Sequence, residues 1–169
     1  MDDFDEFFTE HYPRVVGSLE LAGGAAEDAE DAAQEAFVIA MLRWRSVSGM
    51  DRPATWVYVV AVRALRRRLG RDRSTADRST DEREVSDGTE DVVTAAVISK
   101  ALDTLPPRQR LAVVLRFHGD LTVPEIARAM RCSQGTVKST LHAALGRLRI
   151  DLGDRDLEGH NFEGMRDGS

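Results

Sequence analysis

The chain has 169 residues and a formal net charge of −6 at pH 7, a length that suits one or two small domains with modest cores. It has no apolar run near the roughly 18 residues that span a bilayer, and its first residues are acidic where an export signal is basic. The single cysteine, Cys132, excludes an internal disulfide and a metal site with several thiolates. We expect a cytoplasmic protein without membrane insertion.

The first seventy residues predict three helices. Aromatic and aliphatic residues follow helical spacing from Phe4 to Leu19, and Gly23-Gly24 ends that segment. A second helix, from about Ala26 to Trp44, has alanines and Phe37 on its buried side and Asp28, Asp31, Gln34 and Glu35 on another. A third begins near Pro53, contains Trp56 and ends in Arg66, Arg67 and Arg68. This order favours a protein partner on the acidic helix and a nucleic acid on the arginine-rich one.

The charges alternate in blocks along the chain. Residues 43–73 hold nine arginines against two aspartates, and residues 105–149 hold eight Lys or Arg against two acids. The stretches 1–42, 74–93 and 150–169 are acidic. Because local clusters govern attraction to a polyanion more than net charge does, the two basic blocks are compatible with DNA binding. Solvated helix faces are the alternative for either block alone.

Composition divides the chain into two domains. Residues 74–91 are rich in Ser, Thr, Asp and Glu and have almost no large apolar side chain, so they cannot form a core. We therefore predict an all-α fold of two small helical domains joined by a flexible acidic linker. The predicted boundaries are 1–73 for the first domain, 74–93 for the linker, 94–150 for the second domain and 151–169 for an acidic, mobile tail.

The segment from Leu121 to Arg149 predicts a helix-turn-helix. Thr122 and Glu125 form a capping box at the start of its first helix, and Ser133 can cap the second. In that second helix the apolar residues between Val137 and Leu148 face inward. The outward residues are Gln134, Thr136, Lys138, Ser139, Thr140 and His142. Short polar side chains and a lysine there suit base edges and phosphates in a major groove, although a solvated helical hairpin is the simpler alternative.

These motifs together resemble a known family. The run Ala29 to Phe37 resembles the D-x-x-Q-E-x-F signature of region 2 in bacterial RNA polymerase sigma factors, with Asp31, Gln34, Glu35 and Phe37 in matching places. Residues 56–61 resemble the promoter-melting helix that follows. Residues 105–110 and the helix-turn-helix resemble region 4. Nothing between the domains resembles the extra region of larger sigma factors, so the chain is similar to the extracytoplasmic-function (ECF) group.

The resemblance implies partners and roles. The region-2 helix would bind the clamp coiled coil of core RNA polymerase through Asp31, Gln34 and Glu35. Trp56 would face the opened −10 element of promoter DNA, and the −35 element would receive the helix from Gln134 to His142. Arg63, Arg66, Arg67 and Arg68 would meet phosphates. The resemblance implies an anti-sigma factor as a further partner, and no cofactor. Phe37 and Trp56 can also be core residues.

Five positions depart from the pattern of the family. Arg63 stands where members often have asparagine, and Arg67 stands near a position that is often acidic. Arg131 stands at the usual turn glycine, where a positive φ would cost about 1 kcal/mol. Thr140 and Ala143 stand where many relatives have arginine, so fewer phosphate contacts and a shallower salt dependence are expected.

No enzymatic interpretation competes well. The four histidines, His11, His118, His142 and His160, lack the spacing of metal ligands, and there is no phosphate-binding glycine loop. The main alternative is a helix-turn-helix repressor or regulator with a helical protein-binding module. An anti-sigma-like adaptor is a third possibility, against which the Trp56 helix argues.

Overall fold

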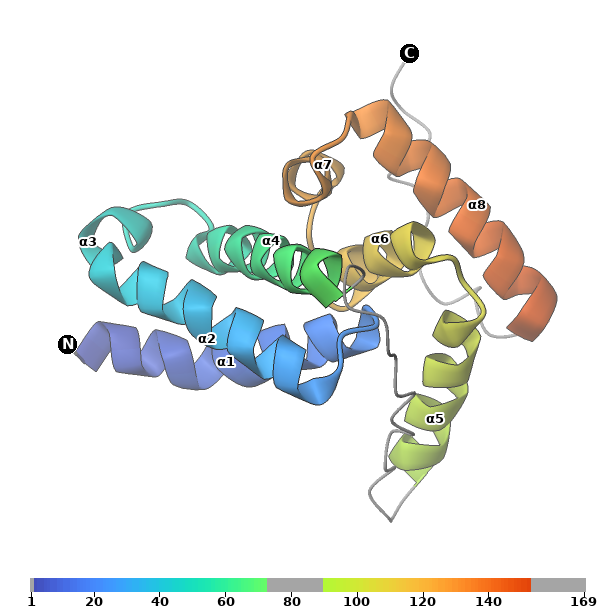
Figure 1. The fold of residues 1–169 in the computed structure, drawn as a ribbon, viewed down its shortest axis with the longest axis horizontal. Helices are drawn as coiled ribbons and strands as arrows, with labels where there is room; N and C mark the ends of the chain where they lie inside the picture. Colours follow the sequence, from blue (N-terminus) through green and yellow to red (C-terminus); the bar gives the residue numbers. More distant parts are fainter. Residues whose placement is uncertain (1, 73–89, 153–169) are drawn as a thin grey trace.

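The computed structural model describes residues 2–72 and 90–152 (Figure 1), and the description below concerns only these. They form helices and turns without a strand. In chain order the helices are α1 (Asp2–Leu21), α2 (Ala26–Leu42), α3 (Trp44–Val47), α4 (Pro53–Asp72), α5 (Glu90–Asp103), α6 (Pro107–Phe117), α7 (Val123–Met130) and α8 (Gln134–Leu152). The predicted all-α class is confirmed.

The first domain consists of α1, α2 and α4 lying side by side, with α3 as a short turn at one end (Figure 1). Five alanines of α2 are fully buried, so its backbone can approach both neighbours closely, and Phe37 is 2% exposed between them. The Phe7, Phe8 and Tyr12 rings of α1 pack around Phe37 at centroid distances of 5.1–5.9 Å. Phe37 is therefore a core residue.

The second helix ends earlier than predicted. The predicted end at Trp44 was wrong, because α2 stops at Leu42 and Arg43 leaves the helical region with φ −114° and ψ 19°. Its N–H then bonds to the carbonyl oxygens of Ile39 and Ala40, and Trp44 begins α3. The Trp44 ring packs edge-on against Phe4 at 5.1 Å, so the break turns a large aromatic side chain toward α1.

The helix-turn-helix has the predicted capping. The Thr122 side chain accepts a hydrogen bond from the Glu125 N–H, and the Glu125 carboxylate accepts one from the Thr122 N–H at 2.7 Å. The Ser133 hydroxyl accepts from the Thr136 N–H at 3.1 Å at the start of α8. Five inward residues of α8 are buried, namely Val137, Leu141, Ala144, Leu145 and Leu148. Arg131 lies in the left-handed region with φ 54° and ψ 51°, as its place at the turn suggested.

The two domains pack directly on each other. Helix α7 lies against α4, α6 contacts α1, and the buried side chains of both domains form one continuous cluster. The sequence predicted two tethered domains and gave no sign of this contact. Helix α5 begins at Glu90, four residues inside the predicted linker of 74–93; residues 73–89 and 153–169, which hold most of that linker and of the predicted tail, lie outside the described residues. None of the described helices has the length and apolar character of a membrane span.

Candidate polymerase and nucleic-acid interfaces

The acidic side of α2 meets the arginine end of α4. Glu35 Oε1 lies 2.5 Å from Arg67 Nη2, and Asp31 Oδ2 lies 3.1 Å from Arg68 Nη1. Glu35 also lies 4.0 Å from Arg68. The structure thus joins two residues expected to bind polymerase to two residues expected to bind DNA.

The side chains in these ion pairs are partly exposed to solvent. The side chains of Arg67 and Asp31 are 57% and 44% exposed, and those of Glu35 and Arg68 about one third. Ion pairs in such positions contribute only about 0–1 kcal/mol, because water screens them and ordering long side chains has an entropic cost. A partner can therefore replace either member at little cost in stability.

Helix α2 also has an apolar surface that sequence reasoning missed. Val38, Met41 and Leu42 are 51%, 48% and 76% exposed, and they follow the exposed Gln34 at helical spacing on the same side of the helix. The signal was present as large apolar residues outside the alanine stripe. A contiguous exposed apolar surface on a helix whose alanine side is already buried indicates a site for a protein partner.

Trp56 lies near the start of α4, half-buried against the core cluster. Further along the same helix, the Tyr58 hydroxyl lies 3.1 Å from Ser18 Oγ, which in turn lies 2.6 Å from His118 Nδ1. Burial raises the pKa of Tyr58. Burial, and then the positive charge of Arg14, lower the pKa of His118 below 6.5. This hydrogen-bonded row of side chains crosses from one domain to the other.

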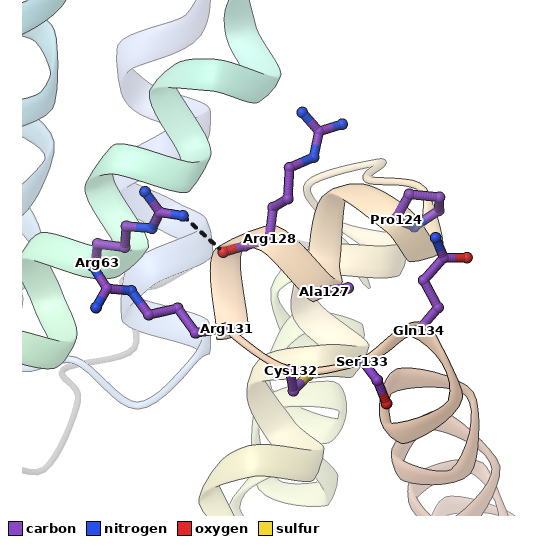
Figure 2. A pocket seen from close by; sticks show the side chains of 8 residues that line it. All are labelled: Arg63, Pro124, Ala127, Arg128, Arg131, Cys132, Ser133 and Gln134. Carbon is purple, nitrogen blue, oxygen red and sulfur yellow. Dashed lines mark hydrogen bonds between the residues drawn. The ribbon is translucent and has the colours of Figure 1, made fainter.

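The other two candidate arginines of α4 bind the helix-turn-helix. Arg63 Nη2 donates to the carbonyl oxygen of Arg128 at 3.0 Å, a bond drawn in Figure 2, and Arg66 Nη1 donates to that of Met130 at 2.8 Å. Both acceptors lie at the carboxyl end of α7, where the helix dipole concentrates negative charge. All four arginines expected to meet phosphates therefore have protein partners here.

Three more arginines join the domains, and sequence reasoning missed all of them. Arg52 binds the Glu125 carboxylate at 2.6 Å and the carbonyl oxygen of Asp120 at 2.8 Å. Arg14 donates twice to the carbonyl oxygen of His118, at 2.9 and 3.0 Å. Arg110 Nε donates to that of Leu21 at 2.6 Å. Most of these acceptors are main-chain carbonyls, which have no sequence signature.

The outward face of α8 stays open. Gln134, Thr136, Lys138, Ser139 and His142 are exposed, while Thr140 is half-buried and donates to the carbonyl oxygen of Thr136 at 2.7 Å. The six predicted groove-facing residues thus share one helix, and the packing of α7 on α4 leaves five of them exposed. Among the described residues, no cluster of His, Cys, Asp or Glu side chains is arranged to hold a metal ion.

Comparison with known families matches both domains. Residues 7–75 match Sigma-70 region 2, and residues 95–148 match Sigma-70 region 4. The RNA polymerase sigma-E factor of Streptomyces avermitilis is 32% identical over 164 residues, which cover 95% of this chain and 91% of the relative. The ECF RNA polymerase sigma factor SigM of Mycobacterium tuberculosis is 31% identical over 151 residues, covering 89% and 77%.

Solved structures share the fold. The sigma factor RpoE, in complex with the anti-sigma factor NepR from Bartonella quintana, matches with a TM-score of 0.72 at 22% identity over 92% of this chain and 100% of that one. CnrH, in complex with the cytosolic domain of CnrY, matches with a TM-score of 0.57 at 18% identity over 88% and 86%. Both regions of this chain that match a family model match a region of sigma factors. The comparisons therefore give no support to the repressor alternative. The chain belongs to the ECF group of RNA polymerase sigma factors.

Proposed function

We propose that this sigma factor binds core RNA polymerase through the exposed side of α2, and that α4 and α8 then direct initiation at the −10 and −35 elements of a promoter. The observation that carries the proposal is the surface of Gln34, Val38, Met41 and Leu42 on α2, called the α2 surface below. Its apolar side chains would supply the buried centre of an interface. Asp31 and Glu35 beside it would speed encounter with a basic partner and fix its register.

On the DNA side, the accessible part of Trp56 would stack against an unpaired base, and the α4 arginines would meet phosphates once their present partners are displaced. The outward residues of α8 would enter the major groove. All of these roles need binding alone, so we propose a protein without catalytic activity or cofactor, acting in the cytoplasm where polymerase and chromosome are. The anti-sigma factor NepR in one of the two similar structures suggests a partner of that kind for this chain.

A binding titration tests the α2 surface. Leu42→Asp places a charge at the most exposed apolar position, and Gln34→Lys adds a cation where a basic partner is expected. Ile150→Asp is the matched control, because Ile150 is 83% exposed but lies on α8 of the other domain. We expect at least a roughly tenfold weaker affinity for core polymerase in the first two variants, since central apolar contacts dominate interface energy.

The helix content of each variant, measured by circular dichroism, must match that of the parent. Equal affinities for the parent and the α2 variants would reject the assignment of this surface. Start sites mapped after transcription of a fragmented genome by core polymerase and this protein would then define the promoter preference.

A further inference from the structure

An open hollow between α4 and the helix-turn-helix is lined by positive charge alone. Its volume is about 670 Å³, in the range of sites that hold small molecules. Arg63 lines it from α4, and Arg128 and Arg131 line it from the helix-turn-helix (Figure 2). The other lining residues are uncharged. No carboxylate in the lining therefore offsets the three guanidinium groups, and the hollow attracts anions.

These arginines have hydrogen-bond donors to spare. Among the described residues, the guanidinium groups of Arg128 and Arg131 have no hydrogen-bond or ion-pair partner. Arg63 donates through Nη2 to the Arg128 carbonyl oxygen at 3.0 Å, but its Nε is buried without a partner. Each guanidinium group has five N–H donors in a fork that matches the oxygens of a phosphate. An anion with several oxygens would thus meet donors from three side chains at once.

The first turn of α8 adds uncharged donors. Ser133 Oγ accepts the Thr136 N–H at 3.1 Å, and the backbone bonds of α8 begin with the Val137 N–H. The N–H groups of Gln134 and Gly135 precede these and have no acceptor within the helix. A Cβ at Gly135 would meet only Ser133 Oγ, 3.8 Å away, so the backbone is open to a ligand there. Phosphate groups bind readily at such a helix start.

Part of the lining is apolar. Pro124 and Ala127 are one turn apart on α7, and both line the hollow. A phosphate gains nothing from such a surface, whereas an apolar group or the face of a base does. The groove-facing residues Lys138 and His142 do not line the hollow, so it is distinct from most of the surface proposed for the −35 element. The lining suits a small molecule with a charged part and an apolar part.

We propose that this hollow binds a small molecule with two or more adjacent phosphate groups and an apolar part, the class to which nucleoside diphosphates belong. Its phosphates bind Arg63, Arg128 and Arg131 and the first turn of α8. Its apolar part lies on Pro124 and Ala127. Because residues of both domains line the hollow, the ligand binds the folded chain and stabilises it. This binding needs neither polymerase nor promoter, so the inference goes beyond the function proposed above.

Two measurements on the full chain test the site. Calorimetric titration with ADP, UDP, inorganic diphosphate and sulfate, at one ionic strength and without divalent cations, gives the affinities. Alkylation by iodoacetamide locates the ligand, because Cys132 is the single cysteine and lines the hollow. Arg128→Gln with Arg131→Gln is the test variant. Arg43→Gln with Arg45→Gln is the matched control, because it removes two exposed arginines that do not line the hollow.

We expect saturable binding of a nucleoside diphosphate, several-fold weaker binding of inorganic diphosphate, and no saturable binding of sulfate. A ligand at about ten times its Kd should slow the alkylation of Cys132 roughly tenfold, since only the free protein reacts. The test variant should bind at least roughly tenfold more weakly, because charge-assisted hydrogen bonds are lost. The control should keep the affinity of the parent. Arg128→Gln alone replaces the test variant if circular dichroism shows that the double substitution lowers the helix content.

The inference would be overturned by a parent that shows no saturable binding of either nucleotide, or by equal affinities in the test variant and the control. Binding that leaves the alkylation of Cys132 unchanged would place the ligand elsewhere and would reject this site. A short DNA duplex is the last arm of the experiment. If the duplex protected Cys132 and the nucleotides did not, the hollow would be a contact for the DNA backbone rather than a site for a small molecule.

Discussion

Glu125 takes part in two interactions with one carboxylate oxygen: its Oε2 accepts the Thr122 N–H at 2.7 Å within the capping box and lies 2.6 Å from Arg52 Nη1 of the other domain. The side chain of Glu125 is only 10% exposed, whereas that of Arg52 is 43% exposed. A local signal for the start of a helix therefore doubles as an anchor between domains. This double role predicts an unusually large effect of substitution at one cap residue.

Glu125→Ala should lower the free energy of unfolding by about 2 kcal/mol, because both the cap and the charged partner of Arg52 are lost. Glu125→Gln should cost less, since glutamine can keep the capping box. Urea denaturation measures both, and a double-mutant cycle with Arg52→Ala should give a coupling of about 0.5 kcal/mol or more. A coupling indistinguishable from zero would mean that the pair contributes nothing to the contact between domains.

His118 should make stability depend on pH. Its pKa is lowered in the folded protein by burial and by Arg14, so below its usual value of 6.5 the unfolded chain takes up a proton that the folded chain resists. Stability is thus fully present above pH 6.5 and declines as the pH falls from there toward the folded pKa. We expect a lower melting temperature at about pH 5.5 than at about pH 7.5.

The matched variant is His118→Gln, which can still hydrogen-bond to Ser18 but cannot titrate in this range. Its melting temperature should vary less between the two pH values than that of the parent. The other histidines are present in both proteins and cancel in the comparison. The same pH dependence in both proteins would exclude His118 as its source.

Arg131→Gly should stabilise the protein by about 1 kcal/mol, because Arg131 has φ 54° and a side chain is disfavoured there. Arg131→Ala is the control, since it also removes the cation near Arg63 but keeps the strained backbone. If both variants were equally stabilised in chemical denaturation, charge repulsion between Arg131 and Arg63, rather than backbone strain, would be the cause.

Trp56→Ala should reduce strand opening by holoenzyme more than it reduces initial promoter binding, because stacking on an unpaired base contributes about 1–3 kcal/mol. Permanganate footprinting reports the opened bases, and a gel-shift titration reports the first complex. Because Trp56 is half-buried, the thermal stability of the variant must be measured together with these two assays. An equal loss in both assays, or a collapse of the melting temperature, would make Trp56 a packing residue.

What could be predicted from the sequence is what depends on neighbours in the chain. The capping box at Thr122, the alanine stripe of α2 and the turn at Arg131 all follow from residues within about ten positions of one another. The early end of α2 at Leu42 was missed, because the helical pattern continues through Arg43 and only the packing of Trp44 on Phe4 favours a break.

The contact between the domains had no such local signal. Ser18 and His118 are 100 positions apart, and the arginines of α4 and α1 bind main-chain carbonyls that any residue could provide. The basic pattern near Arg66 predicts a binding surface for phosphate, and the same guanidinium groups can bind the carbonyl oxygens at the end of a helix. Only the fold brings α7 to that place.

Lys138→Ala tests the role of α8 at the −35 element. Lys138 lies exposed near the start of α8, whereas the nearby Ser139 and Thr140 hydroxyls donate to the Thr136 carbonyl oxygen. The lysine is therefore the cation best placed for a phosphate on that face. Its loss should weaken holoenzyme binding to promoter duplex and reduce the salt dependence by about one unit.

Arg147→Ala is the matched control for Lys138→Ala. It also removes one exposed cation of α8, but nine positions of helix place Arg147 on the side opposite Lys138. The control should leave the salt dependence unchanged if only one side of α8 faces DNA. Equal reductions in the two variants would indicate general attraction to the helix rather than a docked face. If the free protein bound the promoter tightly and Lys138→Ala abolished that binding, polymerase would not be required. Polymerase is expected to be required because a tethered domain gains its second contact only when polymerase holds both domains at the promoter.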